Sequence, residues 1–138
     1  MIETILVPVD GSESSERAVA RAIDIAKVCD AKIIFLYVAN INQLAINPSL
    51  MHAVMDAVKK AGRTILQRAE STVPKGIAKG ILLKVGSPAD LILEVEEDLD
   101  ADLIIMGSRG LGTIKGLLLG SVSQYIMERA ECPVLVVK

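Results

Sequence analysis

The chain alternates short, uninterrupted apolar runs with longer amphipathic stretches, and this alternation limits the possible folds more than any other feature of the sequence. The runs are rich in β-branched residues and cover residues 4–9, 32–39, 81–85, 102–106 and 133–137. A strand with one solvated face alternates apolar and polar residues, so such continuous runs indicate strands that are covered on both faces, as in parallel sheets.

The four stretches between these runs predict helices, because their apolar residues recur at a spacing near 3.6. The expected buried stripes are Ala18, Val19, Ala22, Ile23, Ala26 and Cys29; Leu50, Val54, Ala57, Val58, Ala61 and Ile65; Leu91, Ile92, Val95 and Leu99; and Val122, Ile126 and Met127. Ser12 or Ser14 is a candidate cap for the first helix, Ser87 precedes Pro88 at the start of the third, and Ser121 opens a capping-box pattern for the fourth.

Strand–helix alternation with right-handed crossovers predicts an α/β fold with one doubly wound, five-stranded parallel sheet and helices on both faces. The length of 138 residues is typical of one domain, so we expect residues 1–138 to form a single domain.

Composition excludes several classes of protein. The chain is 51% hydrophobic but only 2% aromatic, which argues against disorder and against platforms that stack the bases of single-stranded nucleic acid. A net charge of −2 gives no electrostatic reason to bind nucleic acid or an anionic membrane. We expect no membrane span, no signal peptide, a cytoplasmic location, and two reduced, structural cysteines, Cys29 and Cys132.

The segment after the fourth strand has the clearest functional pattern. Five of the ten glycines lie between Gly107 and Gly120, and no Asp or Glu occurs from Leu103 to Met127. Glycines let backbone N–H groups approach an oxyanion, and the start of a helix adds partial positive charge. Because ligands of parallel α/β sheets bind at the carboxyl ends of the strands, this segment predicts phosphate binding, with an ordinary loop as the alternative.

Asp10 is the carboxylate at the exit of the first strand. It could accept a hydrogen bond from a ribose or an amino group, bind a phosphate-linked Mg²⁺ through water, or cap the first helix instead. The glycine spacing fits neither the GxxxxGK[ST] nor the GxGxxG pattern.

The spacing Gly107-x-x-Gly110, nine residues, Gly120-Ser121 resembles the nucleotide-binding signature of the ATP-binding branch of the universal stress protein family. The opening strand and turn (residues 5–12), residues 86–89 and residues 132–137 resemble the same family, so the match spans the chain. The resemblance implies an adenine-nucleotide alpha-hydrolase-like sheet of order 3-2-1-4-5. It also implies ATP across the ends of strands one, two and four, with Mg²⁺ or Mn²⁺ bound through the phosphates.

The resemblance also implies roles for individual residues. Asp10 and the backbone of Val38 would serve the adenosine end, and Pro8 and Val9 would shape the pocket floor. Ribose and phosphates would be wrapped mostly by backbone N–H groups, namely those of Gly107, Gly110, Gly120, Ser121 and Val122. Ser123 could reach a terminal phosphate, and Arg109 is a further candidate at a position that varies in the family. Since aromatic residues are scarce, we expect the base to lie against aliphatic groups such as Val9, Val38 and Met106.

An efficient enzyme is disfavoured, because no candidate general base stands near the glycines and His52, the only histidine, falls in the second helix. We therefore expect ATP to be a regulatory ligand with little or no turnover. A slow ATP hydrolase or phosphoryl-transfer enzyme is one alternative, and a dimerisation module that binds no nucleotide is another. A phosphoacceptor receiver lacks its acidic cluster here, and a flavin carrier would need aromatic flanks.

The last strand, from Pro133 to Val137, is short, apolar and expected at an edge of the sheet. An exposed edge of this kind pairs readily with another chain, so we expect a homodimer through this strand, as the resemblance also implies. An interior or loop-covered strand is the alternative.

Overall fold

Five parallel strands form one sheet in the part of the chain that the computed structural model describes, residues 1–40, 47–109 and 119–138. The strands are β1 (Thr4–Pro8), β2 (Lys32–Ala39), β3 (Lys79–Val85), β4 (Leu103–Gly107) and β5 (Val134–Val137). Their order is β3-β2-β1-β4-β5, and each neighbouring pair is parallel. The predicted fold class and strand order are confirmed.

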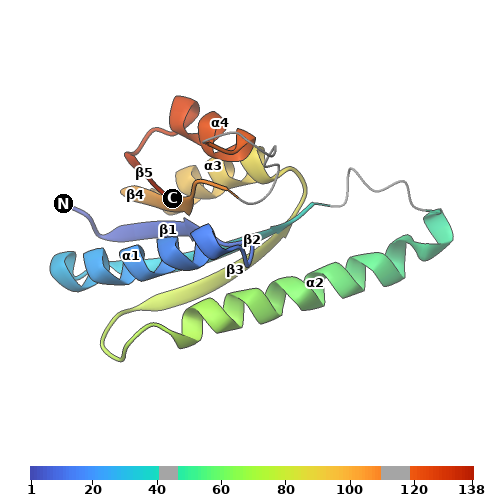
Figure 1. Cartoon of the computed structure of the whole chain (residues 1–138), viewed down its shortest axis with the longest axis horizontal. Helices are drawn as coiled ribbons and strands as arrows, with labels where there is room; N and C mark the ends of the chain where they lie inside the picture. Colours follow the sequence, from blue (N-terminus) through green and yellow to red (C-terminus); the bar gives the residue numbers. More distant parts are fainter. Residues whose placement is uncertain (41–46, 110–118) are drawn as a thin grey trace.

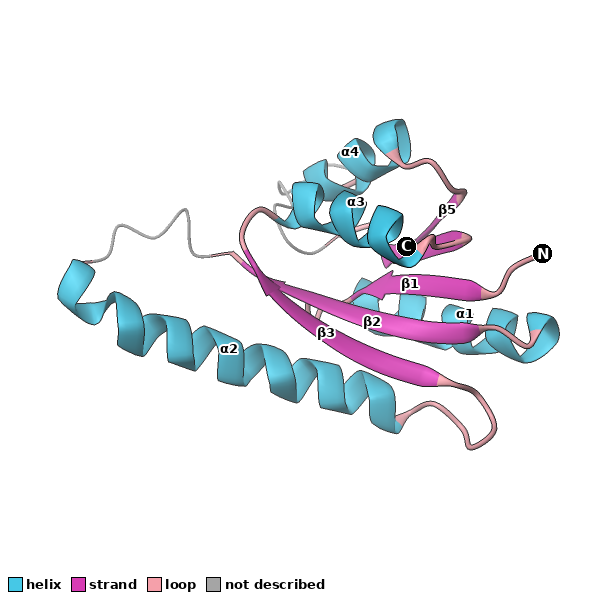
Figure 2. Cartoon of the chain, turned by 180° about the vertical axis from the view of Figure 1, so that it is seen from behind, coloured by secondary structure: helices cyan, strands magenta, loops and turns pink. Residues whose placement is uncertain are grey.

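The helices cover both faces of this sheet (Figures 1 and 2). Helices α1 (Glu13–Cys29) and α2 (Pro48–Ser71) pack on one face, and α3 (Pro88–Leu99) and α4 (Ser121–Arg129) pack on the other. Each face has its own apolar core, with β1, β2 and β4 contributing side chains to both. No helix within the described ranges combines the length and the apolar character that crossing a lipid bilayer requires.

Burial follows position in the sheet. The four residues of β1 from Thr4 to Val7 and all of β4 are buried, whereas β3 and β5, at the two edges, are partly exposed. The continuous apolar runs of the sequence thus correspond to central strands between two helical layers. Strand β3 begins at Lys79, two residues before the predicted run, because polar residues are tolerated on an edge strand.

The predicted helix starts are only partly confirmed. Ser12 caps α1, since its Oγ accepts the N–H of Ser15 at 3.2 Å, and Ser87 precedes Pro88 at the start of α3. The expected capping box at Ser121 is wrong: Gly120 is the cap of α4, with extended backbone angles, and its carbonyl accepts the N–H of Gln124. Ser121 is therefore the first residue of the helix.

Four residues expected to be buried are exposed, namely Leu50, Ala57, Ala61 and Met127. Leu50 is 57% exposed, because α2 begins beyond the end of the sheet and only its C-terminal half lies over the strands (Figure 1). The buried residues of α2 are accordingly Gly62, Leu66 and Ala69. Met127 is 51% exposed, since the short helix α4 buries only the narrow side that carries Ser123 and Ile126.

A buried carboxylate fixes the turn that leads into β5. Glu96 of α3 is buried, and its Oε1 accepts the N–H groups of Glu131 and Cys132, both at 2.8 Å. Burial, followed by the nearby Glu96, raises the pKa of the Cys132 thiol to about 12. Cys132 is therefore a protonated, structural thiol at neutral pH.

Candidate functional site

A pocket of about 450 Å³, counting the space open to solvent at its mouth, lies at the carboxyl ends of β1, β2 and β4, beside α3 and α4. The described residues that line it are Pro8, Val9, Asp10, Ser15, Leu36, Val38, Pro88, Ile92, Met106, Gly107, Arg109, Gly120, Val122 and Ser123.

Ten of the twelve residues expected from the sequence line this pocket. Ser121 does not: it is exposed, at the first position of α4. Gly110 lies outside the described residues. The structure therefore brings together Asp10 after β1, Val38 on β2, Arg109 after β4 and the start of α4, which are far apart in the sequence.

Four lining residues were not expected: Ser15, Leu36, Pro88 and Ile92. Leu36 could have been found, because alternate residues of a strand share a face and Leu36 precedes Val38 by two positions. Pro88 and Ile92 come from α3, and the sequence gives no direct sign of which helix covers this end of the sheet. Ser15 was missed because the serines around it were interpreted only as caps of the first helix.

Gly107 is a glycine for a reason that differs from the expected one. A Cβ at this position would lie 2.5 Å from the Oγ of Ser14 and 2.8 Å from both the carbonyl carbon of Ser14 and the nitrogen of Ser15. The missing side chain therefore lets the first turn of α1 approach the end of β4 closely. Approach of a ligand to the backbone is not needed to explain this glycine.

Ser123 is buried, and its hydroxyl donates a 2.9 Å hydrogen bond to the carbonyl oxygen of Gly107. A hydroxyl has one proton to donate. In this arrangement Ser123 lines the pocket and ties α4 to β4, and its proton points to the backbone of β4.

The polar groups of the pocket have opposite signs at different places. Arg109 and the first turn of α4 provide positive character, because N–H groups in a first turn have no acceptor within the helix. Asp10 is the only acidic residue among the described lining residues, and its Oδ1 accepts the N–H of Ser12 at 2.9 Å.

The rest of the wall is aliphatic, and none of the described lining residues is aromatic. Tyr37 of β2 does not line the pocket, and its ring packs against the backbone of α2, where a Cβ at Gly62 would lie 2.4 Å from it. Burial, and secondarily the charge of Asp10, raises the pKa of this tyrosine.

Within the described ranges, no group of three or more His, Cys, Asp or Glu side chains is arranged to hold a metal ion.

A sequence model of the universal stress protein family matches residues 1–138, the whole chain. The chain belongs to the universal stress protein family. It is 35% identical to a universal stress protein of Thermus aquaticus and 32% identical to the universal stress protein YxiE of Bacillus subtilis, and each match covers 100% of both proteins.

This universal stress protein also resembles solved structures of the family. A universal stress protein in complex with cAMP has 34% sequence identity and a TM-score of 0.75, and the match covers 99% of this chain and 97% of that one. The sheet order and surrounding helices are those of the adenine-nucleotide alpha-hydrolase-like fold.

Substituting Gly107 tests whether helix packing requires this glycine. We expect Gly107→Ala to lower the free energy of unfolding of the nucleotide-free protein by about 1–3 kcal/mol, because the added methyl group meets backbone atoms of α1 that cannot easily move. Urea unfolding followed by circular dichroism measures this change.

Gly80→Ala is the matched control for this prediction. A Cβ at Gly80 of β3 meets only the terminal Cδ1 of Ile34, at 3.1 Å, so the loss should be much smaller. If both variants unfold at the same urea concentration, the packing explanation for Gly107 is wrong.

Proposed function

We propose that this universal stress protein binds ATP in the pocket beside α3 and α4 and acts in the cytoplasm as a homodimeric, regulatory module of the stress response, with little or no turnover. The observation that carries the proposal is the composition of the pocket. An aliphatic wall suits a purine, Asp10 suits a ribose hydroxyl or an amino group, and Arg109 with the start of α4 suits phosphates. The similar family member in complex with cAMP supports an adenine nucleotide as the ligand.

A metal ion would enter with the phosphates in this proposal. Asp10 is the only carboxylate among the described lining residues, and Mg²⁺ or Mn²⁺ prefers several oxygen ligands. Most of those ligands would be phosphate oxygens and water, with Asp10 as a candidate outer ligand. Such an ion would neutralise phosphate charge.

The proposal of little turnover rests on the absence of a suitable base. The described lining residues include no His, Glu or Lys. His52 is exposed on α2, where it lies 3.5 Å from Asp56 of the same helix. The alternative is a slow ATP hydrolase or phosphoryl-transfer enzyme. Among the described lining residues its base would be Asp10, whose carboxylate already accepts the N–H of Ser12.

Phosphate release from ATP and Mg²⁺ distinguishes these two functions. We expect purified protein to release phosphate far more slowly than about 1 s⁻¹, the lower end of ordinary enzyme rates. Sustained release above that rate, lost in Asp10→Asn, would favour the enzyme.

Calorimetric titration with ATP tests the pocket itself. Gly120 lines the pocket with φ −69° and ψ 156°, angles that a β-branched residue adopts readily, so Gly120→Val should fill the pocket without backbone strain. We expect this variant to lose at least about tenfold in ATP affinity, equivalent to about 1.4 kcal/mol. The control Gly80→Val adds the same group on β3, outside the pocket lining, and should bind as the wild type does.

The same titration separates the proposed function from a module that binds no nucleotide. Because none of the described lining residues is aromatic, affinity should fall more from ATP to ADP to AMP than from ATP to GTP. Equal ATP affinity of wild type and Gly120→Val would exclude this pocket as the site. A wild type that binds no nucleotide would favour the dimerisation module.

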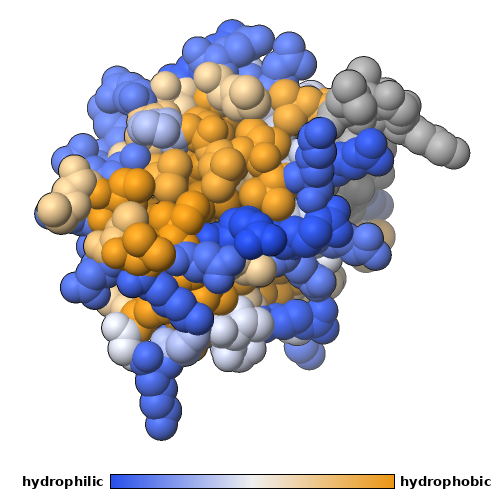
Figure 3. Space-filling model, turned by 60° about the vertical axis from the view of Figure 1, so that its left-hand side comes forward, coloured by the Kyte–Doolittle hydropathy of each residue, from blue (hydrophilic) through white to orange (hydrophobic). Residues whose placement is uncertain are grey.

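The two edges of the sheet differ in a way that supports dimerisation through β5. Strand β3 carries Lys79 and Lys84, and edge lysines discourage pairing with another chain. Strand β5 carries no charged residue. Figure 3 brings forward the side of the molecule on which β5 lies in Figure 1, and hydrophobic residues form a broad patch there.

A lysine on β5 should therefore weaken the dimer. Leu135 of β5 and Ile81 of β3 are 38% and 37% exposed, so they form a matched pair of edge residues. We expect the wild type and Ile81→Lys to sediment as dimers and Leu135→Lys to shift toward the monomer in analytical ultracentrifugation. Loss of the dimer in Ile81→Lys alone would place the interface at the other edge.

A further inference from the structure

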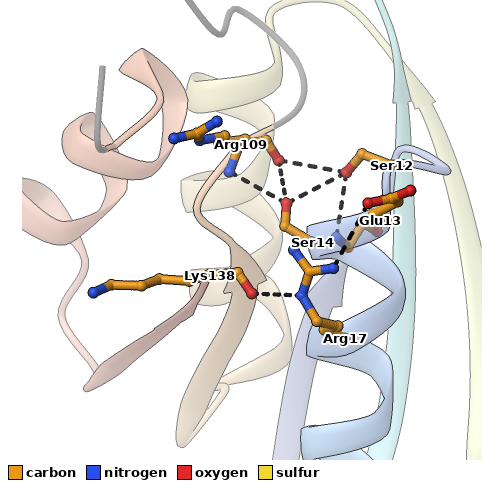
Figure 4. A network of polar contacts seen from close by, with 7 residues as sticks. Ser12, Glu13, Ser14, Arg17, Arg109 and Lys138 are labelled. Carbon is orange, nitrogen blue, oxygen red and sulfur yellow. Dashed lines mark hydrogen bonds and ion pairs between the residues drawn. The ribbon is translucent and has the colours of Figure 1, made fainter. Parts of the chain in front are cut away.

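The two residues that lead out of β4 have all four of their backbone polar groups bonded. The N–H of Ser108 donates to the carbonyl of Val137 at 2.7 Å, and its carbonyl accepts the N–H of Gly120 at 2.6 Å. The N–H of Arg109 donates to the Oγ of Ser14 at 3.3 Å, and its carbonyl accepts the hydroxyl proton of Ser14 at 2.7 Å (Figure 4). One serine side chain thus holds both backbone groups of Arg109.

Ser14 differs in this respect from the serine that caps its helix. The cap is Ser12, whose Oγ accepts the N–H of Ser15 and reaches the carbonyl of Arg109 only at 3.4 Å. Ser14 is 4% exposed, and its hydroxyl bonds to a residue 95 positions away in the sequence. A buried hydroxyl is costly unless it is bonded, and this one finds its partner in the backbone after β4.

The absence of a side chain at Gly107 makes this contact possible. A Cβ there would lie 2.5 Å from the Oγ of Ser14, so a larger residue would push the hydroxyl away from Arg109. The missing side chain of Gly107 thus leaves room for the Ser14 hydroxyl, and that hydroxyl bonds to the backbone of Arg109.

Arg109 connects this contact with the pocket. Its backbone faces Ser14, whereas its side chain points away from Ser14 (Figure 4), and Arg109 lines the pocket. Fixing the backbone on one side sets the direction in which the guanidinium leaves on the other. We propose that Ser14 is a positioning residue. By bonding to the backbone of Arg109, it directs the Arg109 guanidinium toward the phosphates of the bound nucleotide. This inference rests on the proposed nucleotide site.

Calorimetric titration with ATP and with adenosine, on the full chain, tests the role of Ser14. We expect Ser14→Ala to lower ATP affinity about tenfold, as loss of one hydrogen bond would, and to leave adenosine affinity unchanged. Arg109→Gln should show the same selective loss. The double variant should lose no more than Arg109→Gln alone, because Ser14 acts through Arg109.

Ser71→Ala is the matched control, because the Ser71 hydroxyl also donates to a backbone carbonyl at 2.7 Å, that of Arg68, but Ser71 does not line the pocket. Its ATP affinity should stay near that of the wild type. If Ser14→Ala fails to fold, Ser14→Cys keeps the shape of the side chain with a much weaker donor and should give the same selective loss.

The outcomes are distinct. Equal losses for ATP and adenosine, or additive losses in the double variant, would mean that Ser14 has only a structural role and would overturn the inference. If Ser14→Ala binds ATP as tightly as the wild type does, the inference is overturned and the proposed function is left intact. A wild type that binds neither ligand would overturn the proposed function, and the inference with it.

Discussion

The close approach of the first turn of α1 to the end of β4 is the contact on which the candidate site depends. It exists because Gly107 has no side chain where Ser14 and Ser15 pass. Through it the backbone that leaves β4 is held by α1, while Ser123 of α4 bonds to the carbonyl of Gly107 on the other side of the sheet. Two helical layers thus meet at one glycine, at the carboxyl end where ligands of parallel sheets bind.

The fold could be predicted because its evidence is local and redundant. Each central strand is a continuous apolar run, and each helix has a periodic stripe, so the class of the sheet followed from patterns that a few substitutions would not hide. The strand order came from the resemblance to the universal stress protein family and not from these patterns. The errors occur where local pattern and tertiary position disagree. Leu50 fits the apolar periodicity of α2 but is exposed, because this end of the helix lies beyond the sheet. No sequence pattern indicates where the sheet ends beneath a long helix.

The start of α4 illustrates a second limit. Ser121 has the residue type of a cap, but the backbone enters the helix one residue earlier, at Gly120. The carbonyl of Ser108 accepts the N–H of Gly120 at 2.6 Å, and that contact between distant segments helps set the entry. A capping pattern records side-chain preference, whereas the first helical residue depends on where the incoming chain is held.

The sequence predicted which residues lie together better than it predicted what each residue does there. Asp10, Val38 and Arg109 line one pocket as expected, because the carboxyl ends of parallel strands meet. Leu36 was missed although strand alternation implies it, and Pro88 and Ile92 were missed because they depend on how α3 packs on the sheet. The contacts of Gly107 and Ser123 could not be predicted from local sequence. Gly107 faces the first turn of α1, and the Ser123 hydroxyl donates to a carbonyl of β4.

Gly107 and Gly120 therefore support a phosphate site less than the glycine spacing suggests. Gly107 is explained by helix packing, and Gly120 has backbone angles that other residues adopt, so neither requires a phosphate. What favours an anionic ligand is the combination around them: the first turn of α4, the cation of Arg109 and a wall with Asp10 as its only described acid. On the proposed function, a variant with every glycine intact but a misdirected Arg109 would keep the sequence signature and lose much of its attraction for phosphates.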